Sequence, residues 1–407
     1  MHASLARSDR PTRPRRRWFD PAVFDFWARH FNRTWSAQRI LARVIEQRSA
    51  SARATTLLLR PNRHWPGARA GQHLDVTVEI AGVRHRRSYS LSAPPRADGC
   101  IEITVAEVEG GLVSTRLARG LRVGDVIELG APYGGLLLPQ VDTGHADTAI
   151  HAASPVGRAG GTGQRGPALA AATLPGSLAP HEATGLNPAR ANAPVLLLAA
   201  GSGITPLRAL LLEALARGDT RPITLAYWAQ TAAEHCFREE LHELAAQHPN
   251  LHVELLATRD PLNPVGRIDA DRLRSLAPDL AAHAVLACGP EGFIELARAL
   301  CAQACSFQAE GFSPPTAAAG HAPTVRVQLA RSGLELELPT DRPLLQALED
   351  AGQQPAFGCR RGICNTCSCD RLAGASRDLQ SGQTTDAPST PIRLCVHSAA
   401  QGLVLDL

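Results

Sequence analysis

The stretch Cys359-Arg360-Arg361-Gly362-Ile363-Cys364-Asn365-Thr366-Cys367 contains three cysteines in the spacing Cys-x4-Cys-x2-Cys. A fourth cysteine, Cys395, follows after 27 intervening residues. This order and spacing are typical of a plant-type [2Fe-2S] site. The structural alternative is a zinc site, which usually has two Cys-x-x-Cys pairs, whereas this stretch has one. The spacing therefore predicts an iron–sulfur cluster with four ligands, Cys359, Cys364, Cys367 and Cys395.

The residues before the cysteine loop predict the fold around it. Apolar residues alternate over 325–329 and again over 334–338, with Gly333 between them, which is the pattern of a β-hairpin. A helix is expected over 343–351, directly before the loop. We therefore predict a small α+β domain over residues 323–407 that acts as an electron outlet. A one-electron carrier needs an electron source, which the preceding chain should supply.

A nucleotide site is predicted upstream, within residues 193–315. The apolar run 195–200 leads into Gly201-Ser202-Gly203-Ile204-Thr205-Pro206 and then into a helix over 207–216. Glycine amides at the start of a helix can approach a pyrophosphate, and Pro206 suits the first helical turn.

The rest of this region alternates between strand and helix, so a parallel sheet is expected. The strands are expected over 223–228, 252–257 and 284–287, and the helices over 234–248 and 270–276. Ligands of parallel sheets bind at the carboxyl ends of the strands. Four residues fall at such ends, namely Gly201, Thr205, Cys288 and Gly289.

Residues 37–139 predict a small antiparallel β-barrel. Turn signals separate six short β-type runs, at 39–47, 54–60, 73–80, 86–91, 101–107 and 125–130. Within them, Arg87-Ser88-Tyr89-Ser90 offers a cation for a phosphate, an aromatic face for a flat ring and a hydroxyl. Gly110 and Gly111 lead through Ser114 into a short helix, and bare amides at a helix start bind anions. A surface strand and a glycine turn would explain each of the two patterns equally well.

The first 36 residues are basic and aromatic, with eight arginines and three acidic residues. Phe24, Trp27, Phe31 and Trp35 recur at spacings of three and four, which places an aromatic stripe on one face of a short helix. Such a helix suits peripheral contact with an anionic membrane or a membrane-bound partner. The alternative is that the stripe packs on the following domain. Because the net charge of +4 is concentrated in this segment, nucleic-acid binding gains no support.

Residues 140–192 are rich in Ala, Gly, Pro, Thr and Ser, and they predict a disordered linker or insertion. No apolar run is long enough to span a bilayer, and the N-terminus lacks the apolar core of a signal peptide. Ten cysteines in such a chain indicate metal or redox chemistry rather than disulfides. We expect a cytoplasmic protein that can lie at the periphery of a membrane.

Four motifs, in their order along the chain, resemble those of the ferredoxin-NADP reductase superfamily: Arg87-x-Tyr89-Ser90, Gly111-x-x-Ser114, Gly201-x-Gly203-x-Thr205-Pro206 and Cys288-Gly289-Pro290. With the cysteine motif, the chain resembles reductases that carry a C-terminal [2Fe-2S] domain and supply electrons to oxygenases and acyl desaturases. Its N-terminal helix resembles the subgroup that serves membrane-bound fatty-acyl desaturases. The resemblance implies an antiparallel flavin-binding β-barrel, an α/β parallel-sheet nucleotide domain and an α+β β-grasp ferredoxin domain. Residues 140–192 depart from the pattern, since relatives have a short connection there.

The resemblance also implies roles for single residues. The flavin would be held by Arg87, Tyr89, Ser90, Gly110, Gly111 and Ser114, with Phe312 over its other face. The nicotinamide nucleotide would be held by Gly201, Gly203, Thr205, Pro206 and Gly289. Ser90, near the flavin N5, Thr205, and Cys288, beside the reacting nicotinamide carbon, are the candidate catalytic residues. Arg259 offers a cation for a 2'-phosphate, which favours NADPH over NADH, although a surface position would explain it equally.

Together these patterns predict an NAD(P)H-dependent flavin and iron–sulfur reductase. A hydride carries two electrons and a [2Fe-2S] cluster takes one, so a flavin must stand between them. FAD is favoured over FMN because Ser114 begins a helix at a candidate pyrophosphate site. The favoured acceptor is a fatty-acyl desaturase, and the alternative is a ring-hydroxylating or other oxygenase. Two other classes stay open: a redox-responsive binding protein without turnover, and a ferredoxin fused to inactive domains.

Overall fold

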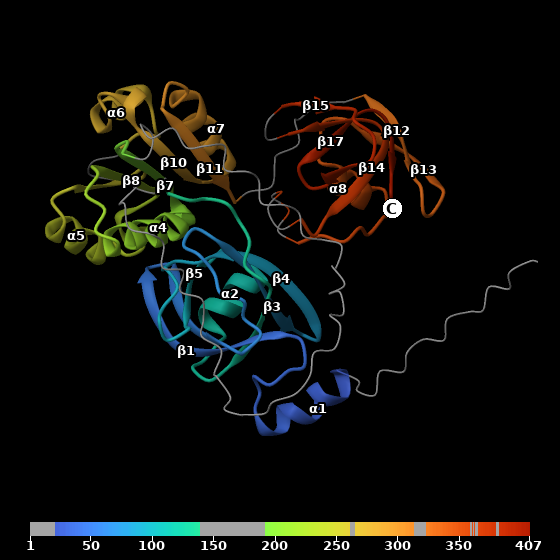
Figure 1. The fold of residues 1–407 in the computed structure, drawn as a ribbon, viewed down its shortest axis with the longest axis horizontal. Helices are drawn as coiled ribbons and strands as arrows, with labels where there is room; N and C mark the ends of the chain where they lie inside the picture. Colours follow the sequence, from blue (N-terminus) through green and yellow to red (C-terminus); the bar gives the residue numbers. More distant parts are fainter. Residues whose placement is uncertain are drawn as a thin grey trace, which may run out of the picture.

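The computed structural model describes residues 21–138, 192–260, 265–312, 323–358, 360, 362, 365–379 and 382–407. These residues form three β-sheets, which Figure 1 shows from blue to red in chain order. The multidomain fold predicted from the sequence is confirmed. The predicted linker lies outside the described residues except for its last position, and its disorder stays a prediction.

The first sheet is the predicted antiparallel barrel, with the strand order β4-β3-β6-β1-β2-β5. Its strands are β1 (Ile40–Ser51), β2 (Ala54–Pro61), β3 (His73–Ile80), β4 (Val83–Ser90), β5 (Ile101–Ala106) and β6 (Val126–Leu129). A tight turn joins β3 to β4 at Ala81-Gly82, where both residues have positive φ. The bridge between Leu91 and Ile103 closes the barrel, and α2 (Leu112–Arg119) packs Leu117 into its core.

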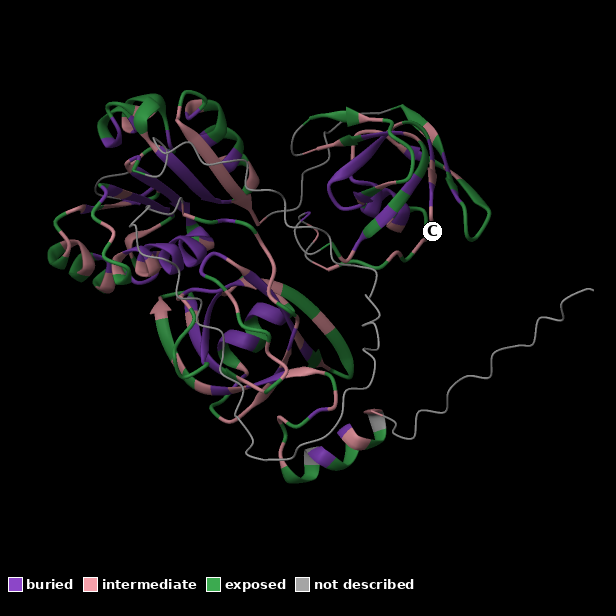
Figure 2. Ribbon diagram, viewed as in Figure 1, coloured by how far each residue is buried: buried purple, intermediate pink, exposed green. Residues whose placement is uncertain are grey.

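The second sheet is parallel throughout, with the order β11-β10-β7-β8-β9. Its strands are β7 (Val195–Ala200), β8 (Ile223–Ala229), β9 (Leu251–Ala257), β10 (Ala284–Gly289) and β11 (Ser306–Gly311). Its helices are α4 (Ile204–Ala216), α5 (Arg238–Gln247), α6 (Ala270–Leu276) and α7 (Glu291–Leu300), with 3-10 turns η1 (Gly201–Gly203), η2 (Ala232–Glu234) and η3 (Leu280–Ala282). Every residue of β7 and β10 is buried, which explains their apolar sequences (Figure 2).

In the nucleotide domain, one predicted helix differs from the sequence pattern, and one α-helix and one strand were not predicted. The helix expected over 234–248 is divided into η2 and α5, because Phe237 adopts a left-handed conformation directly before α5. Helix α7 and strand β11 were not predicted. All six residues of β11 are only half-buried, as expected for a strand at the edge of the sheet, and they lack a continuous apolar run.

The third sheet surrounds the cysteine loop, with the order β13-β12-β17-β14-β15 and with β16 paired to β14. Its elements are β12 (Thr324–Leu329), β13 (Leu334–Pro339), α8 (Leu344–Asp350), β14 (Ser368–Asp378), β15 (Thr384–Thr385), β16 (Thr390–Arg393) and β17 (His397–Leu405). The predicted hairpin is β12–β13, and the predicted helix is α8. Helix α8 packs Leu345 and Leu348 into a core that also contains Cys367 and Cys395.

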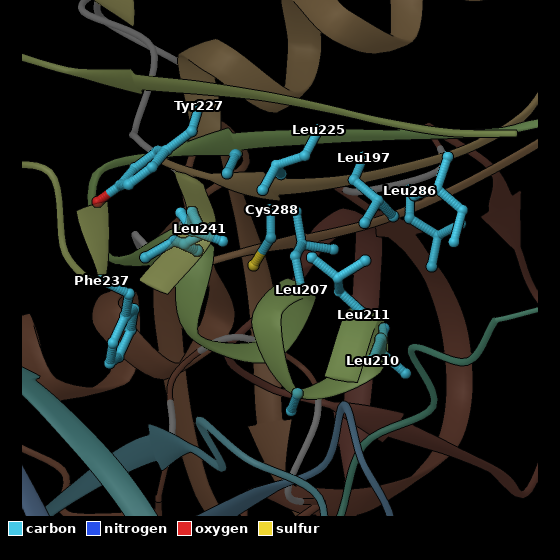
Figure 3. Close-up of a cluster of buried hydrophobic side chains, with 14 of the residues drawn as sticks. Leu197, Leu207, Leu210, Leu211, Leu225, Tyr227, Phe237, Leu241, Leu286 and Cys288 are labelled. Carbon is cyan, nitrogen blue, oxygen red and sulfur yellow. The ribbon is translucent and has the colours of Figure 1, made fainter. Parts of the chain in front are cut away.

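The barrel and the nucleotide domain share one hydrophobic core. Leu210 and Leu211 of α4 belong to the same buried cluster as Ala54, Ala70 and Leu136 from the barrel side. Figure 3 shows the α4 leucines of this cluster beneath the parallel sheet, and Figure 1 shows α4 on the side of the sheet that faces the barrel. The shared burial fixes the nucleotide domain against the barrel.

Helix α1 (Pro21–Phe31) attaches to the barrel through a polar contact rather than through its aromatic stripe. The carboxylate of Asp25 accepts hydrogen bonds from the amide of Ala37 at 2.7 Å and from the guanidinium of Arg39 at 2.8 Å. The exposed fractions of Trp27 and Phe31 are 61% and 82%. The alternative that the stripe packs on the following domain is therefore wrong for these side chains. In the described part of the chain, no helix is long and apolar enough to cross a membrane.

Candidate functional site

The predicted nucleotide loop lies where β7 ends and α4 begins. Gly201 has a φ of 56°, a conformation that favours glycine, and the hydroxyl of Thr205 donates to the carbonyl of Ser202 at 2.9 Å. A Cβ at Gly203 would stand 1.9 Å from the carbonyl oxygen of Cys288, at the end of β10. Glycine at this position allows the backbones of two neighbouring strand ends to meet, which the loop requires in order to present bare amides.

The last residues of the nucleotide domain also lie beside the end of β10. The amide of Phe312 donates to the carbonyl of Gly289 at 3.2 Å, so the predicted flavin-covering aromatic lies beside the end of β10. A Cβ at Gly311 would stand 2.4 Å from a carboxylate oxygen of Glu291, which begins α7. Burial raises the pKa of Glu291 above its usual value, and Glu295 adds to this effect. Thus Gly203, Gly289 and Phe312 meet although they are far apart in the sequence.

The thiol of Cys288 lies in the shared hydrophobic core. Its residue is 0% exposed, and Figure 3 shows the sulfur among Leu207, Leu225 and other apolar side chains. Because this surrounding is apolar and closed, the thiol lines no open cleft in this conformation. The backbone of Cys288, in contrast, faces the nucleotide loop at Gly203. The role predicted from the sequence, beside a nicotinamide ring, stays untested, and the burial of the thiol favours a structural role instead.

Strand β4 carries the predicted flavin residues at its end. Ser90 is buried, Tyr89 is half-buried against the barrel core, and Arg87 is exposed with a guanidinium NH donating to the carbonyl of Arg86. Burial raises the pKa of Tyr89 to about 12, while Arg87 opposes the shift, so its hydroxyl stays neutral at ordinary pH. The strand therefore presents a neutral aromatic ring next to an exposed cation, which suits a flavin and its phosphate.

The glycine turn before α2 borders a hollow of about 470 Å³. Gly110 and Gly111 line it together with Thr115, Arg116 and Arg119 of α2. The hydroxyl of Ser114 donates to the carbonyl of Gly111 at 3.2 Å and accepts from the amide of Val108 at 3.2 Å. Ser114 thus braces the turn from inside, and Arg116 and Arg119 line the hollow. This chemistry fits a phosphate-bearing group.

A buried pair between the two domains was not predicted from the sequence. His73 of β3 lies directly opposite Ser90 in the β3–β4 register, and its Nε2 is 3.0 Å from a carboxylate oxygen of Glu310 on β11. Glu310 stands two residues before Phe312. The pair connects the flavin strand to the segment that carries the covering aromatic. No local pattern predicts it, because the two residues are joined only by the tertiary fold.

The described part of the cluster loop supports iron–sulfur ligation. Cys367 and Cys395 are buried, and the amide of Gly362 donates to Sγ of Cys395 at 3.1 Å. An N–H directed at a cysteine sulfur is a group that stabilises a thiolate ligand. Cys359 and Cys364 lie outside the described residues, and ligation by all four cysteines stays a prediction. Together, the buried sulfurs and the N–H donor fit a [2Fe-2S] cluster.

Two arginines organise the rest of this loop. Arg393 donates to the carbonyl of Gly362 and lies 3.6 Å from a carboxylate oxygen of Asp378. Arg360 has a φ of 57°, pairs with Glu349 of α8 at 2.5 Å and stacks on the ring of Phe357 at 3.9 Å. Arg360 is therefore a braced residue rather than a freely solvated loop cation.

Arg259 lies just beyond the carboxyl end of β9. Its amide donates to the carbonyl of Gln230 at 2.7 Å, which holds the ends of β8 and β9 together. Its side chain is exposed, so the guanidinium is accessible to a phosphate from solution.

Three family models match the chain in the predicted order. An oxidoreductase FAD-binding domain matches residues 42–137, an oxidoreductase NAD-binding domain matches residues 197–299, and a 2Fe-2S iron-sulfur cluster binding domain matches residues 327–399. These matches include the flavin strand, the nucleotide loop and the cluster loop, whereas Glu310 and Phe312 lie between the second and third matched ranges.

Relatives match over nearly the whole chain. The chain is 30% identical over 397 residues to an NADPH oxidoreductase of Mycobacterium tuberculosis, covering 95% of this chain and 89% of the relative. It is 28% identical over 380 residues to the heme-dependent oxidative N-demethylase beta subunit of Ectopseudomonas mendocina, covering 91% and 97%. Among solved structures, phthalate dioxygenase reductase superposes with a TM-score of 0.53 at 20% identity, covering 91% of this chain and 98% of that one. This last likeness concerns the fold alone.

Proposed function

Because the chain belongs to the ferredoxin-NADP reductase superfamily, among the flavin-dependent reductases with a C-terminal [2Fe-2S] domain, we propose that it supplies electrons to an oxygenase. It is an NAD(P)H-dependent oxidoreductase, and its cofactors are FAD and a [2Fe-2S] cluster. When bound, FAD accepts the two electrons of a hydride and passes them singly to the cluster. The acceptor, the individual site residues and the preferred nicotinamide nucleotide are parts of the proposal.

The main support for this function is the contact between strand ends around Gly203. The nucleotide loop, the end of β10 and Phe312 come together there, and the pair of His73 with Glu310 connects them to the flavin strand. Residues that meet in this way from distant segments can hold two reacting groups in line.

Each part of the chain then has a task in binding or orientation. The flavin is held by Arg87, Tyr89, Ser90, Gly110, Gly111 and Ser114, and its second face is covered by Phe312. The nicotinamide nucleotide is held by Gly201, Gly203, Thr205, Pro206 and Gly289. The hydroxyls of Ser90 and Thr205 orient the reacting rings, and the backbone of Cys288 supports the loop. Cys359, Cys364, Cys367 and Cys395 hold the cluster.

NADPH is the favoured donor because Arg259 is exposed where an adenosine 2'-phosphate would be expected, beyond the end of β9. Arg259→Gln should raise the half-saturating concentration of NADPH about tenfold. The half-saturating concentration of NADH should stay within about twofold of the wild-type value. Equal effects on both nucleotides would remove Arg259 from this role.

An oxygenase is the acceptor that the relatives favour. The relative from Ectopseudomonas mendocina is named as a subunit of a heme-dependent demethylase, and another relative is named as the ferredoxin reductase component of a 3-ketosteroid-9-alpha-monooxygenase. The test is NADPH-driven turnover of candidate oxygenases and desaturases from the same source, reconstituted with the purified protein. Turnover of one acceptor class with strict dependence on this chain is expected. Reduction of dyes without turnover of any oxygenase or desaturase would contradict the assignment.

A membrane-bound acyl desaturase is the second candidate, and α1 favours it. Its exposed side chains include Val23, Phe26, Trp27 and Phe31, with the exposed Trp35 and Arg33 directly after it. Aromatic side chains next to arginines suit the interface of an anionic membrane.

The membrane contact has a direct test with vesicles of phosphatidylserine and phosphatidylcholine. The double variant Trp27→Ser, Phe31→Ser should lose sedimentation with these vesicles and keep NADPH-dependent dye reduction. Val123→Ser, which changes an exposed apolar residue of the barrel, is the matched control and should sediment like the wild type. Sedimentation of the double variant at the wild-type level would refute the contact.

A further inference from the structure

A buried arginine in α4 crosses the boundary between the nucleotide domain and the barrel. Arg208 is 4% exposed, although it lies in a helix whose neighbouring residues are apolar. One guanidinium NH lies 2.7 Å from a carboxylate oxygen of Glu102 on β5 and 2.5 Å from the carbonyl oxygen of Ser92. The other arm forms a paired contact with Glu240 of α5, within its own domain. One side chain thus joins three segments.

The carboxylate of Glu102, which binds Arg208 from the barrel side, is itself held by other side chains. Glu102 is buried, accepts a hydrogen bond from the hydroxyl of Ser92 at 3.0 Å and pairs with Arg48 at 2.5 Å. The amide of Ser92 in turn donates to the carbonyl of Glu102 at 2.9 Å. A carboxylate held by Ser92 and Arg48 fixes the guanidinium in one position, since charge-assisted hydrogen bonds are short and directional.

The positions of the joined segments give this contact a consequence for the reaction. Thr205 of the nucleotide loop stands three residues before Arg208, on the first turn of the same helix. Ser90 of the flavin strand stands two residues before Ser92. The contact therefore links the two segments that carry the residues proposed to orient the reacting rings.

We propose that Arg208 and Glu102 form a positioning anchor that sets the approach of the nucleotide loop to the flavin strand. This inference rests on the proposed hydride transfer from NAD(P)H. Buried apolar contacts alone allow small shifts of one domain over the other, whereas a guanidinium held by a fixed carboxylate and a carbonyl defines one register. A misplacement on the order of 1 Å is expected to slow a positioned reaction about 100-fold.

The geometry supplies an internal control, because Glu240 binds the same guanidinium without crossing the boundary. Arg208→Met and Glu102→Gln should each lower the limiting rate of flavin reduction in anaerobic rapid mixing about 100-fold, with a much smaller change in the half-saturating nucleotide concentration. The double variant should reduce flavin no more slowly than Arg208→Met alone, because the two single substitutions remove the same contact between Arg208 and Glu102. Glu240→Gln should stay within about threefold of the wild type. Arg208→Lys should be faster than Arg208→Met but slower than the wild type. It replaces Arg208→Met as the test variant if Arg208→Met does not fold.

A second readout is independent of turnover. Hydrogen exchange of the amides of 202–208 should be faster in Glu102→Gln than in Glu240→Gln, measured on the folded, cofactor-loaded proteins. The anchor alone would be overturned if Arg208→Met and Glu102→Gln lost stability but reduced flavin at the wild-type rate. It would also be overturned if Glu102→Gln and Glu240→Gln had equal effects on flavin reduction and hydrogen exchange. Failure of NAD(P)H to reduce the wild-type flavin would instead overturn the proposed function and the anchor with it.

Discussion

A Cβ at Gly203 would stand 1.9 Å from the carbonyl oxygen of Cys288, so the nucleotide loop and the end of β10 are in contact at a point where only glycine fits. The nearest opposing atoms belong to backbone, which cannot move aside as a flexible side chain does. Because this contact shapes the loop, Gly203→Ala should displace the loop's amides.

The expected result for Gly203→Ala is loss of NADPH-dependent flavin reduction by at least about 100-fold, with the flavin still reducible by dithionite. Gly218→Ala is a suitable control, since nothing lies within 4 Å of its ideal Cβ, although its φ of 72° costs some stability. Wild-type flavin reduction in Gly203→Ala would contradict the arrangement at the end of β10.

The position of the Cys288 thiol predicts a stability effect rather than a catalytic one. Because the thiol is buried among apolar side chains, Cys288→Ala should lower the free energy of unfolding by about 1 kcal/mol through a small cavity. Flavin reduction should stay within about threefold of the wild type. Urea unfolding and rapid mixing measure the two effects, and a loss of more than about 30-fold in rate would place the thiol at the nicotinamide instead.

The attachment of α1 should depend on pH through Asp25. Burial raises the pKa of this carboxyl, but hydrogen bonds from Ala37, Arg39 and Ser36 outweigh it and hold the pKa below its usual value. A lowered folded-state pKa means that the stabilisation is present above the usual carboxyl pKa and is lost as pH falls through the folded value. Tryptophan fluorescence of α1 should therefore be unchanged from pH 7 to about 5 and shift at lower pH.

The variant Asp25→Asn tests the same contact at neutral pH. It should release α1 and increase hydrogen exchange over 21–31, while dye reduction stays at the wild-type level. An unchanged exchange rate would show that another contact holds the helix.

The hydrogen bonds of Gly362 are expected to affect the reduction potential of the cluster. Arg393 donates to the carbonyl of Gly362, whose amide donates to Sγ of Cys395. Arg393→Met should loosen this N–H donor and make the potential more negative, because hydrogen bonds to cluster sulfurs favour the reduced state. The measurement is a redox titration followed by EPR, with Arg326→Met, an exposed arginine on β12, as control. A potential equal to that of the control would contradict this role.

Much of the fold was predictable because it follows local patterns. Alternating apolar residues predicted the β12–β13 hairpin, and continuous apolar runs with intervening helices predicted the parallel sheet. The aromatic spacing predicted α1, but periodicity identifies which residues share a face and not which face packs. The contact of Asp25 with Arg39 decides the packing, and it leaves Trp27 exposed.

The candidate site was predictable where it consists of motifs and not where it consists of long-range pairs. Gly203 and Ser90 belong to short signatures, whereas His73 with Glu310 and Arg208 with Glu102 join segments that are more than 100 residues apart. A single signal was available for Arg208: a charged residue between Leu207 and Ala209 in a helix that is otherwise apolar there. Such a residue is expected to have a buried partner, but the sequence does not say which.

We expect electrons to pass from NADPH through FAD to the [2Fe-2S] cluster within this chain. The most direct measurement is anaerobic mixing of the cofactor-loaded protein with NADPH, followed by optical absorbance and by freeze-quench EPR. The expected result is bleaching of the flavin, followed by the EPR signal of a reduced [2Fe-2S] cluster. A flavin that keeps its absorbance in excess NADPH, or one that bleaches while the cluster stays oxidised, would contradict it.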